Sequence, residues 1–159
     1  MVARVAIWAL CVARVFDPAV DAWLGPVAFL QRPAAILAGL ALLTGSLAGI
    51  AYVHSYLGDA WRSGVGPAGP TVLVTSGPYA RMRHPLFAAV ALGQLGFFLA
   101  LPSLFTLACL GLGLAVLLLQ GRYEERRMDE RFGAAWRGYA SRTPAIWPGL
   151  RGANVPAGA

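Results

Sequence analysis

Residues 86–120 read LFAAVALGQLGFFLALPSLFTLACLGLGLAVLLLQ and contain no charged side chain. A helix of about 20 apolar residues already crosses the hydrocarbon core of a bilayer, so this run is too long for one crossing. Pro102 and Ser103 stand near its middle, and proline is unfavourable inside a helix. The stretch therefore predicts two shorter transmembrane helices, at about 86–101 and 103–120, joined by a tight turn into an antiparallel hairpin.

Two further apolar stretches precede this hairpin. Residues 34–56 form an apolar run that would give a helix of about 35 Å, long enough to cross a bilayer. This run contains Gly45 and Gly49, a G-x-x-x-G pair that favours close helix packing. Residues 2–16 fit either a short first span or a signal peptide, since they combine a basic start with a short apolar core. The absence of a small-residue cleavage site before Asp17 favours the span.

The segments between these runs are polar or rich in proline. Residues 17–33 contain three prolines and Trp23, which predicts a loop lying at the membrane interface. Residues 58–78 predict a second loop, with a brief β-prone stretch at 71–75. Beyond the hairpin, Met128, Phe132 and Trp136 recur at helical spacing, which predicts an amphipathic helix over 123–141. Residues 150–159 are expected to be a disordered tail.

The composition supports an integral membrane protein. Hydrophobic residues make up 58% of the chain and charged residues only 13%, about half the charged share of a soluble domain. We therefore expect residues 1–159 to be one all-α integral membrane domain of about four transmembrane helices, with a C-terminal amphipathic cytoplasmic helix. Cys11 and Cys109 lie in apolar runs without partners at metal-ligand spacing, so no metal site is expected.

The arginines predict an orientation. The formal net charge is +6, and seven of the 13 arginines follow residue 120 rather than being spread as a nucleic-acid surface would need. Eleven arginines would fall on the side of the termini and two on the other, so the positive-inside rule makes both termini cytoplasmic. The use of arginine without lysine, with abundant alanine and glycine, is typical of a GC-rich bacterial genome, so with its apolar spans the protein is expected in a bacterial inner membrane.

This topology brings two polar segments to one membrane face. One segment leads into the hairpin and carries Tyr79, Arg83 and His84; the other leaves it and carries Glu124 and Glu125. Ionisable groups at a membrane boundary are costly unless they pair or serve a ligand. Each residue alone has a structural explanation, such as ion pairing or starting a helix. Their convergence predicts a ligand site.

The same residues carry a family resemblance. The string VTSGPYARMRHPLF at 74–87 and the later Glu124-Glu125, Phe132-Gly133, Trp136 and Tyr139 resemble the two signature blocks of the isoprenylcysteine carboxyl methyltransferase family. The resemblance is close over about 71–148 and implies transfer of a methyl group from S-adenosylmethionine within a helical membrane bundle. It implies that Glu124 lies at the substrate site, where we expect Gln120 and Arg142 to bind substrate as well. Glu124 and Glu125 are the candidate catalytic residues, because a carboxylate can orient a nucleophile or accept its proton. The cofactor-binding residues that the resemblance implies are Thr71, Val72, Leu73, Val74, Tyr79, His84, Pro85, Leu86 and Phe87.

The acceptor of the methyl group stays open at this point. Gln120 stands where the prenylcysteine enzymes place an arginine, and arginine is the natural partner of a carboxylate substrate. Candidate acceptors are lipophilic or small carboxylates, amines or thiols, membrane lipids among them. Two other classes are a relative of the sterol-type membrane reductases that use NADPH and a non-catalytic helical membrane subunit. The oligomeric state is not indicated by the sequence.

Overall fold

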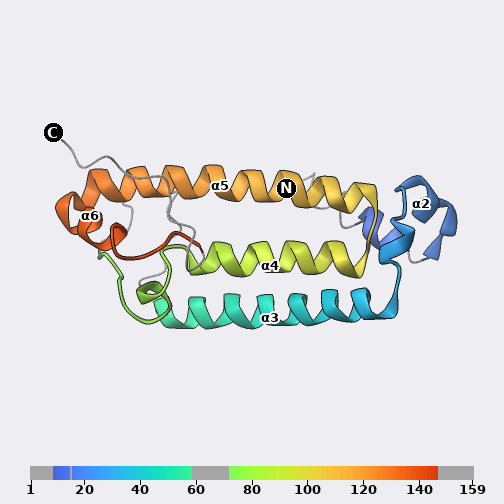
Figure 1. The fold of residues 1–159 in the computed structure, drawn as a ribbon, viewed down its shortest axis with the longest axis horizontal. Coiled ribbons are helices and arrows are strands. Elements are labelled where there is room, and N and C mark those ends of the chain that lie inside the picture. Colours follow the sequence, from blue (N-terminus) through green and yellow to red (C-terminus); the bar gives the residue numbers. More distant parts are fainter. Residues whose placement is uncertain (1–8, 15, 59–71, 147–159) are drawn as a thin grey trace.

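The computed structural model describes residues 9–14, 16–58 and 72–146. Within these residues the regular elements are helices, which confirms the all-helical expectation, and one isolated β-bridge joins Pro26 to Ser103. Three long helices run side by side, α3 (Pro33–Leu57), α4 (Pro85–Ala100) and α5 (Leu104–Phe132) (Figure 1). The central helix α4 packs along α3 over most of its length and forms an antiparallel hairpin with α5.

Two of these helices are long and apolar enough to cross a membrane, namely α3 with 25 residues and α5 with 29. The third, α4, is also apolar but has only 16 residues. Residues 9–14 are helical, whereas 1–8 and 15 lie outside the described residues, as does the tail at 150–159. The number of four crossings and the cytoplasmic placement of the termini therefore stay predictions.

Helices α3 and α4 approach closely because small residues face each other. A Cβ atom added to Gly39 would lie 2.5 Å from the backbone nitrogen of Ala100 and 2.7 Å from the carbonyl oxygen of Gly96. The Ser46 hydroxyl donates a hydrogen bond of 2.8 Å to the carbonyl oxygen of Ala89 across the same contact. Close approach of this kind supplies the van der Waals contact that holds apolar helices together in lipid.

The two glycines of the G-x-x-x-G pair in α3, Gly45 and Gly49, have different surroundings. A Cβ atom at Gly49 would meet the Ala89 side chain at 3.3 Å, whereas one at Gly45 would meet nothing within 4 Å. Only Gly49 thus faces α4. Gly45 lies on a surface of α3 that no described residue covers.

The turn between α4 and α5 is fixed by side-chain caps and by the N-terminal segment. Ser103 is fully buried and accepts a hydrogen bond from the Thr106 backbone, while the Thr106 hydroxyl accepts one from the Ser103 backbone. This reciprocal arrangement is a capping box, which satisfies amide groups that a helix start leaves free. Arg14 donates to the carbonyl oxygen of Leu101 at 3.0 Å and forms an ion pair with Asp21.

The loop expected over residues 17–33 is largely helical instead. It contains α2 (Pro18–Trp23) and a short 3-10 helix, η1 (Ala28–Leu30). Asp17 caps α2 by accepting a hydrogen bond from the Ala19 amide, and Pro18 occupies the first helical position, where its missing N–H costs nothing. The described residues 72–75 of the β-prone stretch contain no strand.

The separate amphipathic helix predicted over 123–141 is wrong in its boundaries. Helix α5 continues without interruption to Phe132, and α6 (Ala134–Ala140) follows after Gly133. Gly121 does not break α5, because a single glycine costs a helix only about 1 kcal/mol. The break comes at Gly133, whose φ of 49° lies in the region that glycine adopts readily.

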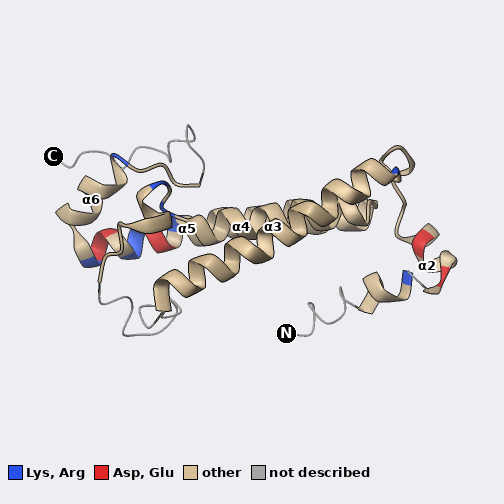
Figure 2. Cartoon of the chain, turned by 90° about the horizontal axis from the view of Figure 1, so that it is seen from below, with Lys and Arg blue, Asp and Glu red and all other residues tan. Residues whose placement is uncertain are grey.

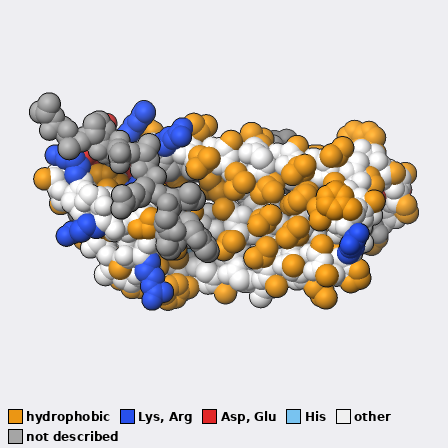
Figure 3. Space-filling model, viewed as in Figure 1, with side chains coloured by type: hydrophobic (Ala, Val, Ile, Leu, Met, Phe, Trp, Pro, Cys, Tyr) orange, Lys and Arg blue, Asp and Glu red, His pale blue; other side chains and the backbone are white. Residues whose placement is uncertain are grey.

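Charges are concentrated at the ends of the helix layer. In Figure 2 the charged residues gather near α6 and the adjoining end of α5, with a smaller group near α2 at the opposite end. Figure 3 shows hydrophobic side chains over the middle of one face and several arginine side chains toward the α6 end. Exposed leucines of α5, such as Leu112 and Leu119, contribute to the apolar surface. This distribution suits a protein whose middle lies in lipid.

Candidate functional site

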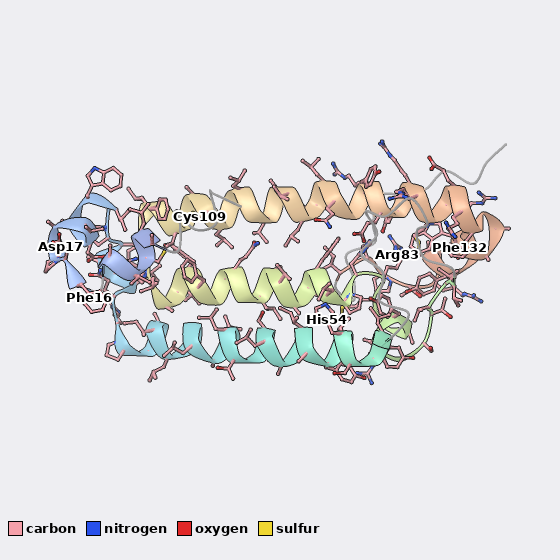
Figure 4. All side chains as sticks on the ribbon, turned by 180° about the vertical axis from the view of Figure 1, so that it is seen from behind. Phe16, Asp17, His54, Arg83, Cys109 and Phe132 are labelled. Carbon is pink, nitrogen blue, oxygen red and sulfur yellow. The ribbon has the colours of Figure 1, made fainter. Side chains whose placement is uncertain are left out.

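The buried guanidinium of Arg83 lies at the centre of the charged end of the bundle (Figure 4). Its Nε and Nη2 atoms donate hydrogen bonds of 2.9 and 2.7 Å to the same oxygen, Oε1 of Glu125. Its Nη1 atom donates to the carbonyl oxygens of Ala140 and Thr143 at 2.8 and 2.7 Å. Its guanidinium carbon also lies 5.9 Å from the centre of the Trp136 ring. Arg83 therefore donates four hydrogen bonds to protein acceptors.

The His84 imidazole lies between two carboxylates. Its Nε2 atom is 3.2 Å from Oε1 of Glu125, and its Nδ1 atom is 3.8 Å from Oε2 of Glu124. The ring stacks on Phe87 with a centroid distance of 5.2 Å and an angle of 7° between planes. These contacts hold the ring plane fixed while both nitrogens face acidic groups.

Glu124 differs from its neighbour because no arginine contacts it in the described part of the chain. Its hydrogen-bond partner there is Gln120, whose Nε2 atom donates to Oε1 of Glu124 at 3.3 Å. The side chain of Glu124 is 36% exposed, against 20% for Glu125. Glu124 is thus the carboxylate of the pair that is open to a ligand.

The chain after α6 crosses the start of α4. The backbone amides of Arg83 and His84 donate to the carbonyl oxygens of Pro144 and Ala145 at 2.9 and 2.8 Å. The Tyr139 hydroxyl donates to the carbonyl oxygen of Tyr79 at 2.7 Å. This C-terminal crossing, residues 139–145, ties the beginning of α4 to the end of α5.

The buried Tyr139 of this crossing and its half-buried partner Tyr79 predict a loss of stability at alkaline pH. Burial raises the pKa of Tyr139 to about 12 from an ordinary value of 10.0, and burial together with the charge of Glu124 raises the pKa of Tyr79 to about 12 as well. Because the folded state favours the neutral phenols, their contribution is present below pH 10 and is lost as the pH rises through about 12. We expect the thermal midpoint in detergent to fall over this range together with the appearance of tyrosinate absorbance. A Tyr79→Phe/Tyr139→Phe variant should lose part of that fall; an unchanged alkaline profile would contradict the assignment.

The structure brings together most of the residues singled out in the sequence. Glu124, Glu125, His84 and Phe87 lie in one cluster, with Gln120 at its edge and Pro85 and Leu86 on the first turn of α4. Tyr79 lies beside it in a short 3-10 helix, η3 (Gly77–Ala80). Thr71 falls outside the described residues, Val72 is 65% exposed, and Leu73 and Val74 are half-buried. Arg142 is exposed and makes no described side-chain hydrogen bond or ion pair.

Sequence reasoning left two participants out of its list of site residues. Arg83 was recognised as part of the polar grouping but given no role, although it organises Glu125 and the C-terminal crossing. Gly121 is buried beneath the ring pair, and a Cβ atom there would lie 3.8 Å from Phe87 and 3.9 Å from Nε2 of His84. The helical spacing of four residues between Gly121 and Glu125 was the available signal that both face α4.

An apolar helical layer with two helices long enough to span a bilayer, and a cluster of ionisable side chains at one end, is typical of a membrane-associated protein. The phospholipid methyltransferase family matches residues 33–135, which include α3, α4 and α5 with Arg83, His84, Glu124 and Glu125. The chain belongs to this family.

Two curated bacterial proteins are similar to part of the chain. A cobalt-zinc-cadmium resistance protein of Cupriavidus metallidurans is 42% identical over 79 residues, which are 49% of this chain and 36% of that protein. A nickel-cobalt-cadmium resistance protein of Alcaligenes xylosoxydans xylosoxydans is 35% identical over 80 residues, 50% of this chain and 38% of that protein. The chain thus matches little more than a third of the length of each relative. No solved structure matches it closely.

Proposed function

We propose that the protein is a membrane methyltransferase that takes its methyl group from S-adenosylmethionine and transfers it to an amine or thiol on a lipophilic acceptor. The observation that carries the proposal is the cluster of His84, Glu124 and Glu125 inside the region that matches the phospholipid methyltransferase family. The polar cluster adjoins helices with an apolar surface, so a lipophilic molecule would reach it from the membrane.

The residues present suit a cationic methyl donor. When bound, S-adenosylmethionine supplies a methyl group activated by a positively charged sulfonium. Glu124 offers a carboxylate without an arginine partner in the described chain, and Phe87 offers an aromatic ring that stacks on the neighbouring His84. Both kinds of group attract a cation. His84, Pro85, Leu86 and Tyr79 would line the same side of the site, as the resemblance implies.

The charges around Glu124 favour an acceptor that is not a carboxylate. The buried Arg83 commits four of its five N–H donors to Glu125 and to two carbonyl oxygens, and its side chain is only 7% exposed, so it is poorly placed to bind a substrate anion. Gln120 occupies the position next to Glu124 that an arginine would need. A carboxylate substrate would face Glu124 at a cost, because like charges repel strongly where little water screens them. An ammonium or thiol would instead be attracted and could give up its proton.

We expect purified protein in detergent micelles to bind S-adenosylmethionine and S-adenosylhomocysteine, measured by isothermal titration calorimetry. Glu124→Gln should weaken S-adenosylmethionine more than S-adenosylhomocysteine, because only the former carries the sulfonium charge. Arg126→Gln, an exposed change two residues further along the same helix, is the matched control and should leave both affinities unchanged. NADPH binding without binding of either methyl compound would replace the proposal with a reductase. No binding of any of the three would indicate a non-catalytic subunit.

A labelled-methyl assay distinguishes amine, thiol and carboxylate acceptors. We expect methyl transfer in vesicles containing phosphatidylethanolamine, or to a long-chain alkanethiol in phosphatidylcholine vesicles, with little transfer to oleate. The two productive arms distinguish an amine headgroup from a lipophilic thiol. Glu124→Gln should lower kcat by about 10²-fold or more if this carboxylate takes the proton of the acceptor. Transfer to oleate alone would overturn the choice of acceptor.

A further inference from the structure

The two glutamates and His84 differ in what they can do with a proton. We propose that His84 is a proton acceptor placed behind Glu124 and oriented by Glu125, so that a proton taken from the acceptor passes to Glu124 and then to Nδ1 of His84. This inference rests on the proposed function and assigns separate roles to three neighbouring residues.

The orientation of the imidazole follows from the contacts of Glu125. Its Oε1 atom already accepts two hydrogen bonds from Arg83, so it stays an acceptor toward Nε2 of His84 at 3.2 Å. A neutral imidazole has one N–H and one bare nitrogen, and the hydrogen bond to one nitrogen decides which is which. The proton of neutral His84 therefore lies on Nε2. Nδ1 is left bare and faces Glu124 at 3.8 Å.

In this arrangement a carboxylate, an imidazole and a proton-carrying group lie in series, namely Glu125, His84 and Glu124. Such a carboxylate fixes the tautomer of the imidazole and stabilises the imidazolium that forms when the second nitrogen takes a proton. Glu125 has this position, held by Arg83, and Phe87 stacks on the ring. The charged groups that face His84 in the described chain are Glu124, Glu125 and, through Glu125, Arg83.

We call this proton path, from the acceptor to Glu124 and then to His84, the relay. It is needed only for an acceptor that carries a proton. An ammonium gives one proton to Glu124, and the freed nitrogen lone pair forms a bond to the methyl carbon. The carbon–sulfur bond of the donor breaks, and its electron pair stays on sulfur, which becomes a neutral thioether. The proton then moves from Glu124 to Nδ1 of His84, which restores the carboxylate. A carboxylate acceptor would release no proton and would have no use for this path.

The first test reads the tautomer directly. The chain has two histidines, so a His54→Asn variant with isotope-labelled histidine and a histidine-free purification tag leaves one imidazole for nitrogen NMR in micelles. We expect the neutral ring of His84 to carry its proton on Nε2. A proton on Nδ1 would overturn the relay, and calorimetric binding of S-adenosylmethionine to the same sample would show that the proposed function survives. Absence of that binding would count against the function instead.

The second test separates proton transfer from support of the fold. A His84→Gln side chain keeps an N–H that can reach Glu125 but has no bare ring nitrogen toward Glu124. We expect it to keep the thermal midpoint and, at saturating S-adenosylmethionine, to lower kcat on phosphatidylethanolamine vesicles by about 10²- to 10⁴-fold. Measuring at saturation separates this loss from any change in cofactor affinity at His84. Added imidazole should restore part of this activity. A variant with normal kcat would overturn the relay, as would a kcat loss that imidazole does not relieve.

Discussion

An Arg83→Gln variant should lose about 3 kcal/mol of unfolding free energy, the largest loss that we expect from one polar substitution in this chain. Removing one partner of a buried ion pair leaves the other charge without compensation, which typically costs about 3–5 kcal/mol. Arg83 and Glu125 have side chains only 7% and 20% exposed, so little water replaces the lost donors. The carbonyl oxygens of Ala140 and Thr143 lose a donor as well. Denaturant titration in mixed micelles, followed by circular dichroism, measures the loss.

Three companion variants show whether the ion pair is the cause. Arg81→Gln changes an exposed arginine two positions earlier and should stay within about 0.5 kcal/mol of the parent. The unfolding free energy of Arg83→Lys should lie between those of the parent and of Arg83→Gln. An ammonium keeps the charge but cannot present the planar fork that binds Glu125 and two carbonyls together. Arg83→Met combined with Glu125→Met should be less destabilised than the sum of the two single changes. Additive losses would mean that the two side chains are not coupled.

A Gly39→Ala variant should destabilise the protein by about 3 kcal/mol, at the upper end of what an overpacked contact costs. The new methyl group would lie 2.5 Å from the Ala100 nitrogen and 2.7 Å from the Gly96 oxygen, both of them backbone atoms that cannot rotate away. Helices α3 and α4 would have to separate. The same titration in mixed micelles measures the effect.

Gly45→Ala is the matched control in the same helix. Nothing lies within 4 Å of the added methyl group, so the change brings only the better helix propensity of alanine, about 1 kcal/mol in favour of folding. The two substitutions are chemically identical and should act in opposite directions. Equal effects at Gly39 and Gly45 would contradict the close packing of α3 on α4.

The sequence could predict the long helices because their signals are local. An apolar run broken by Pro102 and Ser103 describes the α4–α5 turn well, and Pro85 marks the first residue of α4. The end of α5 was missed because polarity changes near residue 121 while helix propensity does not. A change of solvent from lipid to water need not end a helix, whereas the positive φ of Gly133 does. Helix α2 was missed because it lies in a proline-rich segment, which was interpreted as a loop although Asp17 caps a helix there.

The candidate site could be predicted as a set of residues but not as a set of roles. The hairpin brings the His84 and Glu124-Glu125 segments together, and the family resemblance supplied their chemistry. Which glutamate pairs with Arg83 depends on the direction in which each side chain leaves α5, a rotation of about 100° between neighbours. The carbonyl partners of Arg83 come from residues 140 and 143, nearly sixty positions away, and no sequence pattern marks them.

If α4 and α5 cross a bilayer, their unequal lengths would set the depth of the cluster in it. At 1.5 Å per residue, the 16 residues of α4 extend about 24 Å and the 29 of α5 about 43 Å, against a hydrocarbon core of about 30 Å. His84, at the start of the shorter helix, would then lie at or just beneath the headgroup level while α5 continues into water. A lipid acceptor would meet the site by lateral diffusion in its own leaflet and would not have to be lifted out of the membrane. The rate of methyl transfer would accordingly depend on the surface density of the acceptor in the membrane and on the thickness of the bilayer. It would not depend on the bulk concentration of the acceptor.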